Sequence, residues 1–372
     1  MIVLARRHVM GRYLFVEVAR TWLVVAGVLL FLTLGLGFAK FIAQAAAGDL
    51  PVDTVLQLAF FSAMENGGMV LPLSMLLAVL LTLGRLCRDN EMAAMQAGGA
   101  GLGVIYRPFV LLALLVALLA GGLSLLAAPQ AGKTIDQLTA QTIGTALQTL
   151  APGKFLTLLD GDAVFYAESR DDSGVLHNVF IRVVRSGSDG ETIRAVVTAK
   201  RALQRTDPDT GAQVLVLEDG WRYEGRAGEA NWRIVHFAEH GVRVDLDAGS
   251  GVDDDAGAAS TATLLASAEP EAAAELQARL SVPLSILILT LLGLPLGKLP
   301  PRAGRYGRII VGVLLYVVYF NLIHLATVWV ETQALPAVVG VWAVHGAMLL
   351  LAIGLIMREQ GVFVRRGRQV TA

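Results

Sequence analysis

The chain has 372 residues, of which 55% are hydrophobic and only 16% are charged. Soluble domains carry about 25% charged residues, so this composition excludes a single water-soluble globule. One cysteine, Cys87, excludes a disulfide framework and every cysteine-based zinc or iron–sulfur site. Residues 129–278 hold 13 basic and 23 acidic side chains, whereas the rest of the chain is net basic. These features are typical of a membrane protein with a polar insert.

Six uncharged apolar runs are long enough to cross a bilayer, which needs about 20 helical residues. Because backbone polar groups cannot stay unpaired in lipid, each run is predicted to be a helix. The runs form two sets of three around the insert: Thr21–Ala39, Asn66–Gly84, Pro108–Gly132, Leu280–Gly297, Ile309–Val330 and Thr332–Met357. The predicted organisation is residues 1–132 with three spans, 133–278 as the insert, and 279–372 with three spans and a basic tail.

The basic residues predict how the chain is oriented. Both termini and the links after the second and fourth runs together hold 15 lysines and arginines. Of the opposite short loops, one holds a single cation, Lys40, and the other holds Glu331 and no cation. The positive-inside rule therefore predicts cytoplasmic termini and an exported insert. A cleaved signal peptide is the alternative for the first run, because Ala43-Gln44-Ala45 has the small-x-small form. The run is, however, longer than the ~7–15 apolar residues of a signal sequence.

The insert is predicted to be all-β. Short runs rich in Val, Ile, Phe and Tyr alternate with turn residues and predict seven strands: Lys154–Leu159, Ala163–Glu168, Val175–Val184, Thr192–Leu203, Ala212–Leu217, Trp221–Glu224 and Trp232–Leu246. Strands without intervening helices favour an antiparallel sandwich or open roll. At its borders, Lys133–Gln148 is predicted to extend the third span as a helix, Ala248–Ala268 to be a loop and Glu269–Arg279 to be helical.

Two strings resemble catalytic motifs but do not carry the chemistry. Gly132-Lys133-Thr134 lacks the first glycine of a phosphate-binding loop, because Ala127 stands in its place. His236-Phe237-Ala238-Glu239-His240 matches an inverted zinc-protease string, but its surroundings predict a strand, which would separate the histidines by about 13 Å. We therefore predict no catalytic residues, no metal site and no cofactor in this chain.

The link between the second and third runs, Gly84–Gly99, is the most informative segment. Asp89 or Asn90 is predicted to cap a short helix over Glu91–Ala97, and Gly98 is predicted to end it.

This short helix is predicted to be amphipathic. Met92 and Met95 are three residues apart and give it one soft apolar edge beside the acidic Glu91. Such a helix at the cytoplasmic end of two spans is suited to docking on a soluble partner. An ordinary interfacial helix is the alternative interpretation.

Two charged residues near the outer ends of spans are candidates for lipid binding. Lys40 would act as a point charge on the phosphates of a lipid, although a snorkelling lysine that anchors the span is the alternative. Glu65 precedes the second run, where intramembrane charge normally faces a cavity or a partner, but it is also placed to be interfacial.

Two polar pairs within the spans are predicted to be structural. Glu17 and Arg20 are three residues apart and are predicted to form an ion pair. Asn321 and His324 share a helix face and are predicted to make interhelical hydrogen bonds rather than to relay protons.

Several short motifs, in this order along nearly the whole chain, resemble one family. They are Arg12-Tyr13-Leu14, Leu71-Pro72-Leu73, Gly84-Arg85-Leu86-x-x-Asp89-x-Glu91-Met92, Pro152-Gly153-Lys154-Phe155, Leu217-Glu218-Asp219-Gly220-Trp221-Arg222-Tyr223-Glu224, and Leu335-Pro336 followed by Val341-Trp342-x-x-His345. With three spans on each side of an insert, the chain resembles the lipopolysaccharide export permeases of the LptF/LptG (YjgP/YjgQ) family, and the LptF branch most. Asn90 departs from the small serine expected in many members.

The resemblance implies a membrane-helical fold with a periplasmic β-jellyroll-like insert, in the inner membrane. It implies the permease subunit of an ABC transporter that extracts lipopolysaccharide from the outer leaflet, paired with an LptG-like permease. Two LptB-like ATPases would bind ATP and complete an LptBFG complex, and an LptC-like single-span protein and an LptA-like bridge would receive the lipid. Residues of about 88–98 would form a coupling helix that contacts the ATPase through Arg88, Asp89, Glu91, Met92 and Met95.

Three other classes of protein remain as alternatives. Another ABC-type exporter of lipids or lipoproteins usually has four spans with its large domain after the first. A secondary transporter would fit two sets of three spans, but no charged relay lies in mid-membrane. A membrane-anchored enzyme would need a catalytic constellation, and the sequence predicts none.

Overall fold

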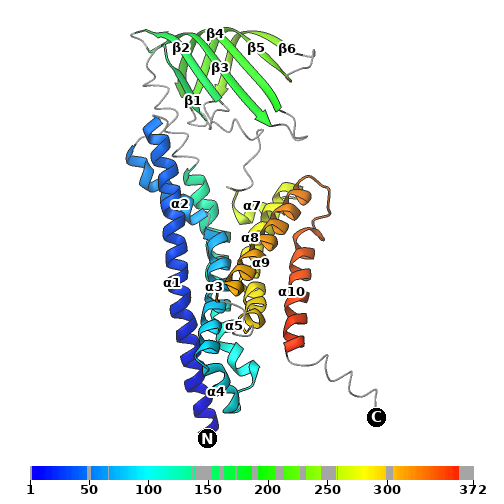
Figure 1. The fold of residues 1–372 in the computed structure, drawn as a ribbon. Helices are drawn as coiled ribbons and strands as arrows, with labels where there is room; N and C mark the ends of the chain where they lie inside the picture. Colours follow the sequence, from blue (N-terminus) through cyan, green and yellow to red (C-terminus); the bar gives the residue numbers. More distant parts are fainter. Residues whose placement is uncertain are drawn as a thin grey trace. The chain divides into compact units, whose positions relative to one another are not determined.

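The computed structural model describes residues 2–47, 52–65, 67–135, 138, 153–158, 163–171, 174–186, 192–206, 213–226, 232–243, 257, 259–298 and 305–359. The chain divides into two units (Figure 1). A helical unit comprises Met1–Gly37, Phe60–Lys133 and Ala256–Ala372, and a second unit comprises Phe38–Ala59 and Thr134–Asp255.

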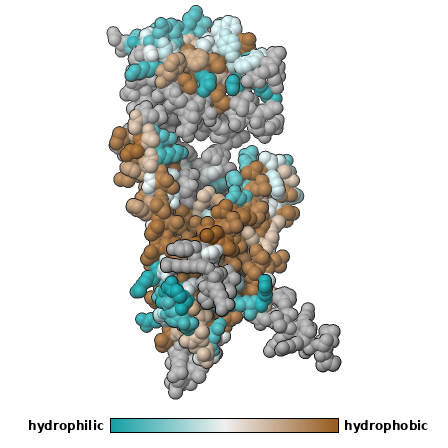
Figure 2. Space-filling view, viewed as in Figure 1, coloured by the Kyte–Doolittle hydropathy of each residue, from teal (hydrophilic) through white to brown (hydrophobic). Residues whose placement is uncertain are grey.

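The six predicted spans are confirmed. The helices are α1 (Ile2–Ala47), α2 (Val55–Glu65, after a 3₁₀ turn at Val52–Thr54), α3 (Gly67–Arg88), α4 (Glu91–Ala97), α5 (Leu102–Gly122), α7 (Thr261–Ala266), α8 (Pro270–Leu296), α9 (Arg305–Glu331) and α10 (Gly340–Glu359). Of the described helices, α1, α3, α8, α9, α10 and α5 with its continuation to Ile135 are long and apolar enough to span a membrane. Apolar side chains gather over the surface of these helices (Figure 2).

Some predicted boundaries are wrong. The last span begins at Gly340 rather than Thr332, because Gln333 takes a left-handed φ of 59° and Pro336 brings no N–H to a helix. The predicted loop Ala248–Ala268 contains α7, whose first turn is capped by the Ser260 hydroxyl accepting the Thr263 N–H at 3.2 Å. The described part of the predicted extension of the third span is helical as far as Ile135, and its remainder lies outside the described residues, apart from Leu138.

The helical unit packs around α3 and α8. In the most apolar stretch of each helix, 67% of the residues are buried in α3 and 56% in α8, but only 6% in α1. α3 and α8 therefore form the centre of the helical unit. α8 approaches α3 through two glycines: a Cβ on Gly297 would lie 2.8 Å from Leu83 Cβ, and one on Gly293 would lie 3.1 Å from Val79 Cγ1. Small residues four apart allow this close contact in a membrane, where apolar burial alone does not drive helices together.

The described strands of the insert form one antiparallel sheet, which confirms the all-β prediction. The strands are β1 (Phe155–Leu158), β2 (Ala163–Arg170), β3 (Leu176–Ser186), β4 (Thr192–Thr206), β5 (Gln213–Arg226) and β6 (Arg233–Arg243). Each described strand pairs with the next along the chain, so the order is that of a meander, and the crossovers of a jellyroll are not among these pairings. Two predicted strands, Ala212–Leu217 and Trp221–Glu224, belong to the single strand β5.

Five strands skip one position each in the paired register, and these positions lie opposite one another. The skipped residue is Ala238 in β6, and in β2, β3, β4 and β5 it is polar: Glu168, Asn178, Lys200 and Asp219. Asn178 and Asp219 have a φ of 50°, which Asn and Asp tolerate better than other side chains. We call the four polar residues the polar row.

The alternation of buried and exposed residues along a strand shifts by one position at the polar row. In β4 the buried residues are Val197 and Ala199 before Lys200, and Ala202 after it. In β3, Leu176 and Val179 are buried on either side of Asn178. Each strand therefore shifts its alternation by one residue at the same place, and the sheet keeps one buried face.

Candidate functional site

The turn between α3 and α4 places the candidate site. α3 ends at Arg88 and α4 begins at Glu91, so only Asp89 and Asn90 separate them. Asn90 adopts a left-handed φ of 58° and its side chain makes no capping bond. The predicted helix is therefore confirmed, but the predicted side-chain cap is wrong: the Asp89 carboxylate pairs instead with Arg85 and Arg88.

The predicted end of α4 is confirmed. The Gly98 N–H donates to the Ala94 carbonyl at 2.9 Å. Gly99 follows with a φ of 83°, which favours glycine, and α5 begins at Leu102.

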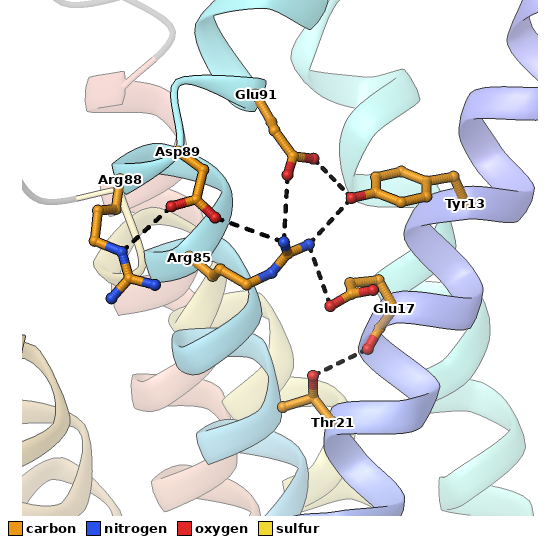
Figure 3. A network of polar contacts seen from close by, with 7 residues as sticks. All are labelled: Tyr13, Glu17, Thr21, Arg85, Arg88, Asp89 and Glu91. Carbon is orange, nitrogen blue, oxygen red and sulfur yellow. Dashed lines mark hydrogen bonds and ion pairs between the residues drawn. The ribbon is translucent and has the colours of Figure 1, made fainter.

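Arg85, in the last turn of α3, joins three segments of the chain (Figure 3). Its guanidinium nitrogens lie 3.1 Å from Glu17 Oε1 on α1, 3.6 Å from Asp89 Oδ2 in the turn and 3.3 Å from Glu91 Oε1 on α4. The Tyr13 hydroxyl on α1 accepts from Arg85 Nη2 at 3.1 Å and donates to Glu91 Oε2 at 2.7 Å. We call these five residues the Arg85 cluster.

The Arg85 cluster positions α4 more than it stabilises the fold. The side chains of Arg85 and Glu91 are 34% and 31% exposed, and partly solvated ion pairs contribute about 0–1 kcal/mol each. The planar guanidinium holds several acceptors in fixed directions, which a lysine cannot do. One guanidinium faces three carboxylates, so the cluster keeps negative charge that favours a cationic partner.

Sequence reasoning identified the acidic members at Asp89 and Glu91 but missed Arg85, Tyr13 and Glu17. Arg85 precedes Asp89 by four residues, and this spacing of an ion pair on a helix could have identified Arg85 as a partner of Asp89. Tyr13 and Glu17 lie far from Arg85 in the sequence, so only the packing of α1 beside α3 brings them into contact with it.

The two faces of α4 differ in what they contact. Met92 is buried and belongs to the core of the helical unit, and Met95 is partly buried against the same core. The predicted methionine edge thus faces the chain itself. The exposed residues of α4 are Ala93, Ala94, Gln96 and Ala97. A partner that approached α4 would therefore meet a face of small side chains next to the Arg85 cluster.

The two lipid-binding candidates lie elsewhere in the sequence. Lys40 is exposed on α1, with its Nζ 6.0 Å from the centroid of the Phe41 ring. Glu65 ends α2, and its side chain lies outside the described part of the chain.

Both predicted structural pairs are wrong. Glu17 pairs with Arg85, and Arg20 is exposed on α1. Asn321 donates to the Val317 carbonyl of its own helix at 2.8 Å, and His324 is exposed on α9. A period of three or four residues places side chains on one face of a helix but does not say which neighbour that face meets.

A buried hydrogen-bond chain that sequence reasoning missed joins α8, α9 and α10. The Ser281 hydroxyl donates to the Gln277 carbonyl at 2.7 Å, so it can only accept from His345 Nε2, 2.9 Å away. His345 therefore carries its proton on Nε2, and Nδ1 accepts from the Tyr319 hydroxyl at 2.6 Å. The only signal available was a histidine within an apolar run.

A second missed cluster joins the ends of three helices. Lys298, just after α8, lies 2.8 Å from the Glu359 carboxylate at the end of α10. The Tyr106 hydroxyl on α5 donates to the same carboxylate at 2.7 Å, and the lysine Nζ lies 4.8 Å from the centroid of the Tyr106 ring.

The strand predicted for the string His236–His240 is confirmed by β6. His236 contacts the Trp221 ring, with centroids 4.5 Å apart, and lies 3.4 Å from Asp219. His240 instead contacts the Phe237 ring, with centroids 5.1 Å apart. The two imidazoles thus have different neighbours, as strand spacing requires.

Comparison with known proteins extends over both sets of spans and the insert. A family model described as lipopolysaccharide export system permease LptF/LptG matches residues 12–358. The chain is 27% identical over 364 residues to lipopolysaccharide export system permease protein LptF of Escherichia coli strain K12. This alignment covers 96% of this chain and 98% of that protein. The LptF proteins of Escherichia coli O157:H7 and Shigella flexneri align with the same identity and coverage. The matched region includes the complete Arg85 cluster, and the chain belongs to the family of lipopolysaccharide export system permeases LptF/LptG.

Proposed function

We propose that the chain is the permease subunit of an ABC transporter that extracts lipopolysaccharide from the outer leaflet of the inner membrane and passes it to a periplasmic bridge toward the outer membrane. The observation that carries this proposal is the family match over residues 12–358, which includes six spans and the β insert. In this role the chain is a transporter subunit, and ATP is hydrolysed by a separate protein.

The distribution of basic residues supports the orientation of this permease. Arginines and lysines gather at both termini and in the links that follow α3 and α8, so these parts lie in the cytoplasm. The insert then lies in the periplasm. α4 and the Arg85 cluster lie on the cytoplasmic side, where a soluble ATPase has access to them.

The proposed function requires partners. An LptG-like permease would complete a heterodimer, and an LptB-like ATPase dimer would bind ATP and drive transport. An LptC-like single-span protein and an LptA-like bridge would receive the lipid from the β insert. The relatives named LptF support these partners, because a permease of that name is one component of an export system.

Glu91 is the residue that we assign to contact with the ATPase. A carboxylate has about four lone-pair positions. Arg85 and Tyr13 each occupy one oxygen, so positions remain for a guanidinium of the partner. Because the cluster fixes the direction of the carboxylate, little side-chain entropy is lost on binding. Arg88, 61% exposed, and Asp89 lie at the edge of the same contact.

The ATPase contact can be tested by co-purification. Glu91→Ala is expected to weaken capture of the ATPase about tenfold or more, since loss of one partner leaves the other charge unpaired. Glu331→Ala, which removes an exposed carboxylate at the far end of α9, is the matched control and should capture the ATPase normally. Normal capture and normal growth with Glu91→Ala would contradict this assignment.

Lipid transport can be tested by photo-crosslinking. A crosslinker in the β insert is expected to capture lipopolysaccharide only when ATP and a functional ATPase are present. Lys40→Gln should lower capture by a second crosslinker on α1, while Lys40→Arg should retain it, because the proposed role of Lys40 is a positive charge near lipid phosphates. Capture that does not depend on ATP, or that requires a proton gradient instead, would overturn the proposed function.

A further inference from the structure

Arg279 is a buried charged side chain that the proposed function does not yet use. It lies in α8, and only 5% of the side chain is exposed. Burying a charge without partners is strongly unfavourable, so its surroundings must satisfy it. Its first partner is Glu275, one turn earlier on α8, with Nε 2.7 Å from Oε1.

The remaining contacts of Arg279 reach a segment well before α8 in the sequence. Its Nη2 donates to the Gly257 carbonyl at 2.7 Å, and its Nη1 donates to the Ala259 carbonyl at 2.9 Å and to the Thr261 hydroxyl at 3.2 Å. One guanidinium therefore holds Gly257, Ala259 and Thr261 against α8. α7 starts at Thr261, packs on α8 and buries Leu264.

The same junction also includes the third span. α5 passes into a π-helical turn at Leu123–Ala127, a distortion that often marks functional sites. The Thr261 hydroxyl donates to the Leu125 carbonyl in this turn. The Ser124 hydroxyl donates to the backbone carbonyl of Arg279 at 3.2 Å. Hydrogen bonds therefore connect the π-helical turn, the start of α7 and α8.

The junction joins residues that precede the insert to residues that follow it. The chain leaves the helical unit after Lys133 and returns to it at Ala256. The contacts of Arg279 and Thr261 thus tie the last turns before the insert to the first residues after it. We propose that Arg279 is a positioning residue that makes α5, α8 and both connections to the insert move together, so that movement of the spans reaches the insert. This inference rests on the proposed function.

The inference predicts a loss of coupling rather than a loss of ATP hydrolysis. Lysine retains the charge of Arg279 but lacks the planar fork that serves its three acceptors outside α8. In a reconstituted complex with its permease partner and ATPase, Arg279→Lys should leave the ATPase rate within about twofold. ATP-dependent transfer of lipopolysaccharide to a soluble acceptor should fall about tenfold, within the range by which residues along a coupling path alter it.

Two further variants sharpen the test. Thr261→Val keeps the Arg279–Glu275 pair and removes the hydroxyl that accepts from Arg279 and donates to Leu125, so it tests the proposal even where Arg279→Lys does not assemble. It should lower transfer in the same direction. Arg358→Lys, at an exposed arginine near the end of α10, is the matched control and should transfer normally. Hydrogen exchange over residues 259–266 should rise in both junction variants and stay unchanged over α4.

The outcomes separate this inference from the proposed function. If the unmodified complex transfers lipid and both junction variants transfer it equally well, the inference is overturned and the proposed function stands. If assembly, ATPase rate and transfer fall in parallel, Arg279 is only a structural residue and the inference is also overturned. If the unmodified complex shows no ATP-dependent transfer, the proposed function fails and takes the inference with it.

Discussion

The carboxylate of Glu17 on α1 lies 3.1 Å from the guanidinium of Arg85 on α3, although 68 positions separate them in the numbering. Arg20, the nearer basic residue in the sequence, is exposed instead. The contact makes Arg85 a link between the first span and α4 beside the direct Tyr13–Glu91 hydrogen bond, because the same guanidinium holds Glu91.

This link predicts different effects for two neighbouring residues of α1. Glu17→Gln should weaken the coupling of ATP hydrolysis to transport, because Arg85 loses a charged partner on α1 but keeps Glu91. Arg20→Gln should have no such effect. The measurement is the ratio of lipid transferred to ATP hydrolysed in the reconstituted complex. Equal ratios in the two variants would contradict the link.

The hydrogen-bond chain of Tyr319, His345 and Ser281 predicts that substitutions within it have coupled effects on stability. Tyr319→Phe and His345→Phe each remove one end of a buried hydrogen bond, worth about 0.6 kcal/mol on average and up to ~1.7 in membrane proteins. The double variant should lose less than the sum, because the bond is lost only once. Denaturant unfolding in mild detergent measures this, and additive losses would show that the two side chains act independently.

The close approach of α8 to α3 predicts that added side-chain volume destabilises the bundle. Gly297→Val would force its Cβ to within 2.8 Å of Leu83 Cβ, an overpacking that typically costs about 1–3 kcal/mol. Gly346→Ala on α10 is the control, since nothing lies within 4 Å of its Cβ position. The thermal midpoint of the purified complex should fall for Gly297→Val alone.

The sheet is predicted to lose stability in acid through His240. Burial, and then the nearby Arg222, hold the pKa of His240 below its ordinary value of 6.5. The unfolded chain therefore binds this proton more readily than the folded sheet, so stability falls as the pH drops below 6.5 and levels off above it. Hydrogen exchange of β5 and β6 in the full-length protein, compared between pH 5 and pH 8, measures this. His240→Gln should flatten that pH dependence, and an unchanged profile would contradict the assignment.

The surroundings of Asp219 favour its charged form, whereas those of His240 disfavour the charged form of the imidazole. Both effects make the sheet less stable in acid. Its hydrogen bond with Lys200, with smaller help from His236, lowers the pKa of the carboxyl group. The contribution of this pair is present at neutral pH and is lost as the pH falls through the lowered pKa. Asp219→Asn removes only this more acidic step, which distinguishes it from the effect of His240.

Local patterns in the sequence predicted the elements but not their contacts. The apolar runs gave six spans because length and hydropathy are properties of one segment, and Gly98 marked the end of α4 for the same reason. The start of the last span was missed because the residues after Thr332 are apolar enough to belong to a membrane helix. The left-handed φ of Gln333 and the missing N–H of Pro336 nevertheless keep this segment out of the helix.

The candidate site was predicted only in part, for a related physical reason. Glu91 and Asp89 stood out as charges beside an apolar helix. Arg85 was missed as their partner because its role depends on Tyr13 and Glu17, which tertiary packing brings to it. Met92 was expected to face a partner, but a helix of seven residues has one apolar edge, and the chain's own core covers it.

The polar row has a consequence for how the insert can change during evolution. Each of the four strands of the row skips one residue, as β6 does at Ala238, and the strands stay aligned because all five do so at the same level. A deletion of that residue in a single strand would turn every side chain beyond it to the wrong side of the sheet. Length changes at these positions are therefore tolerated only when neighbouring strands acquire them together, whereas substitutions at the exposed positions of the sheet need no matching change in a neighbouring strand.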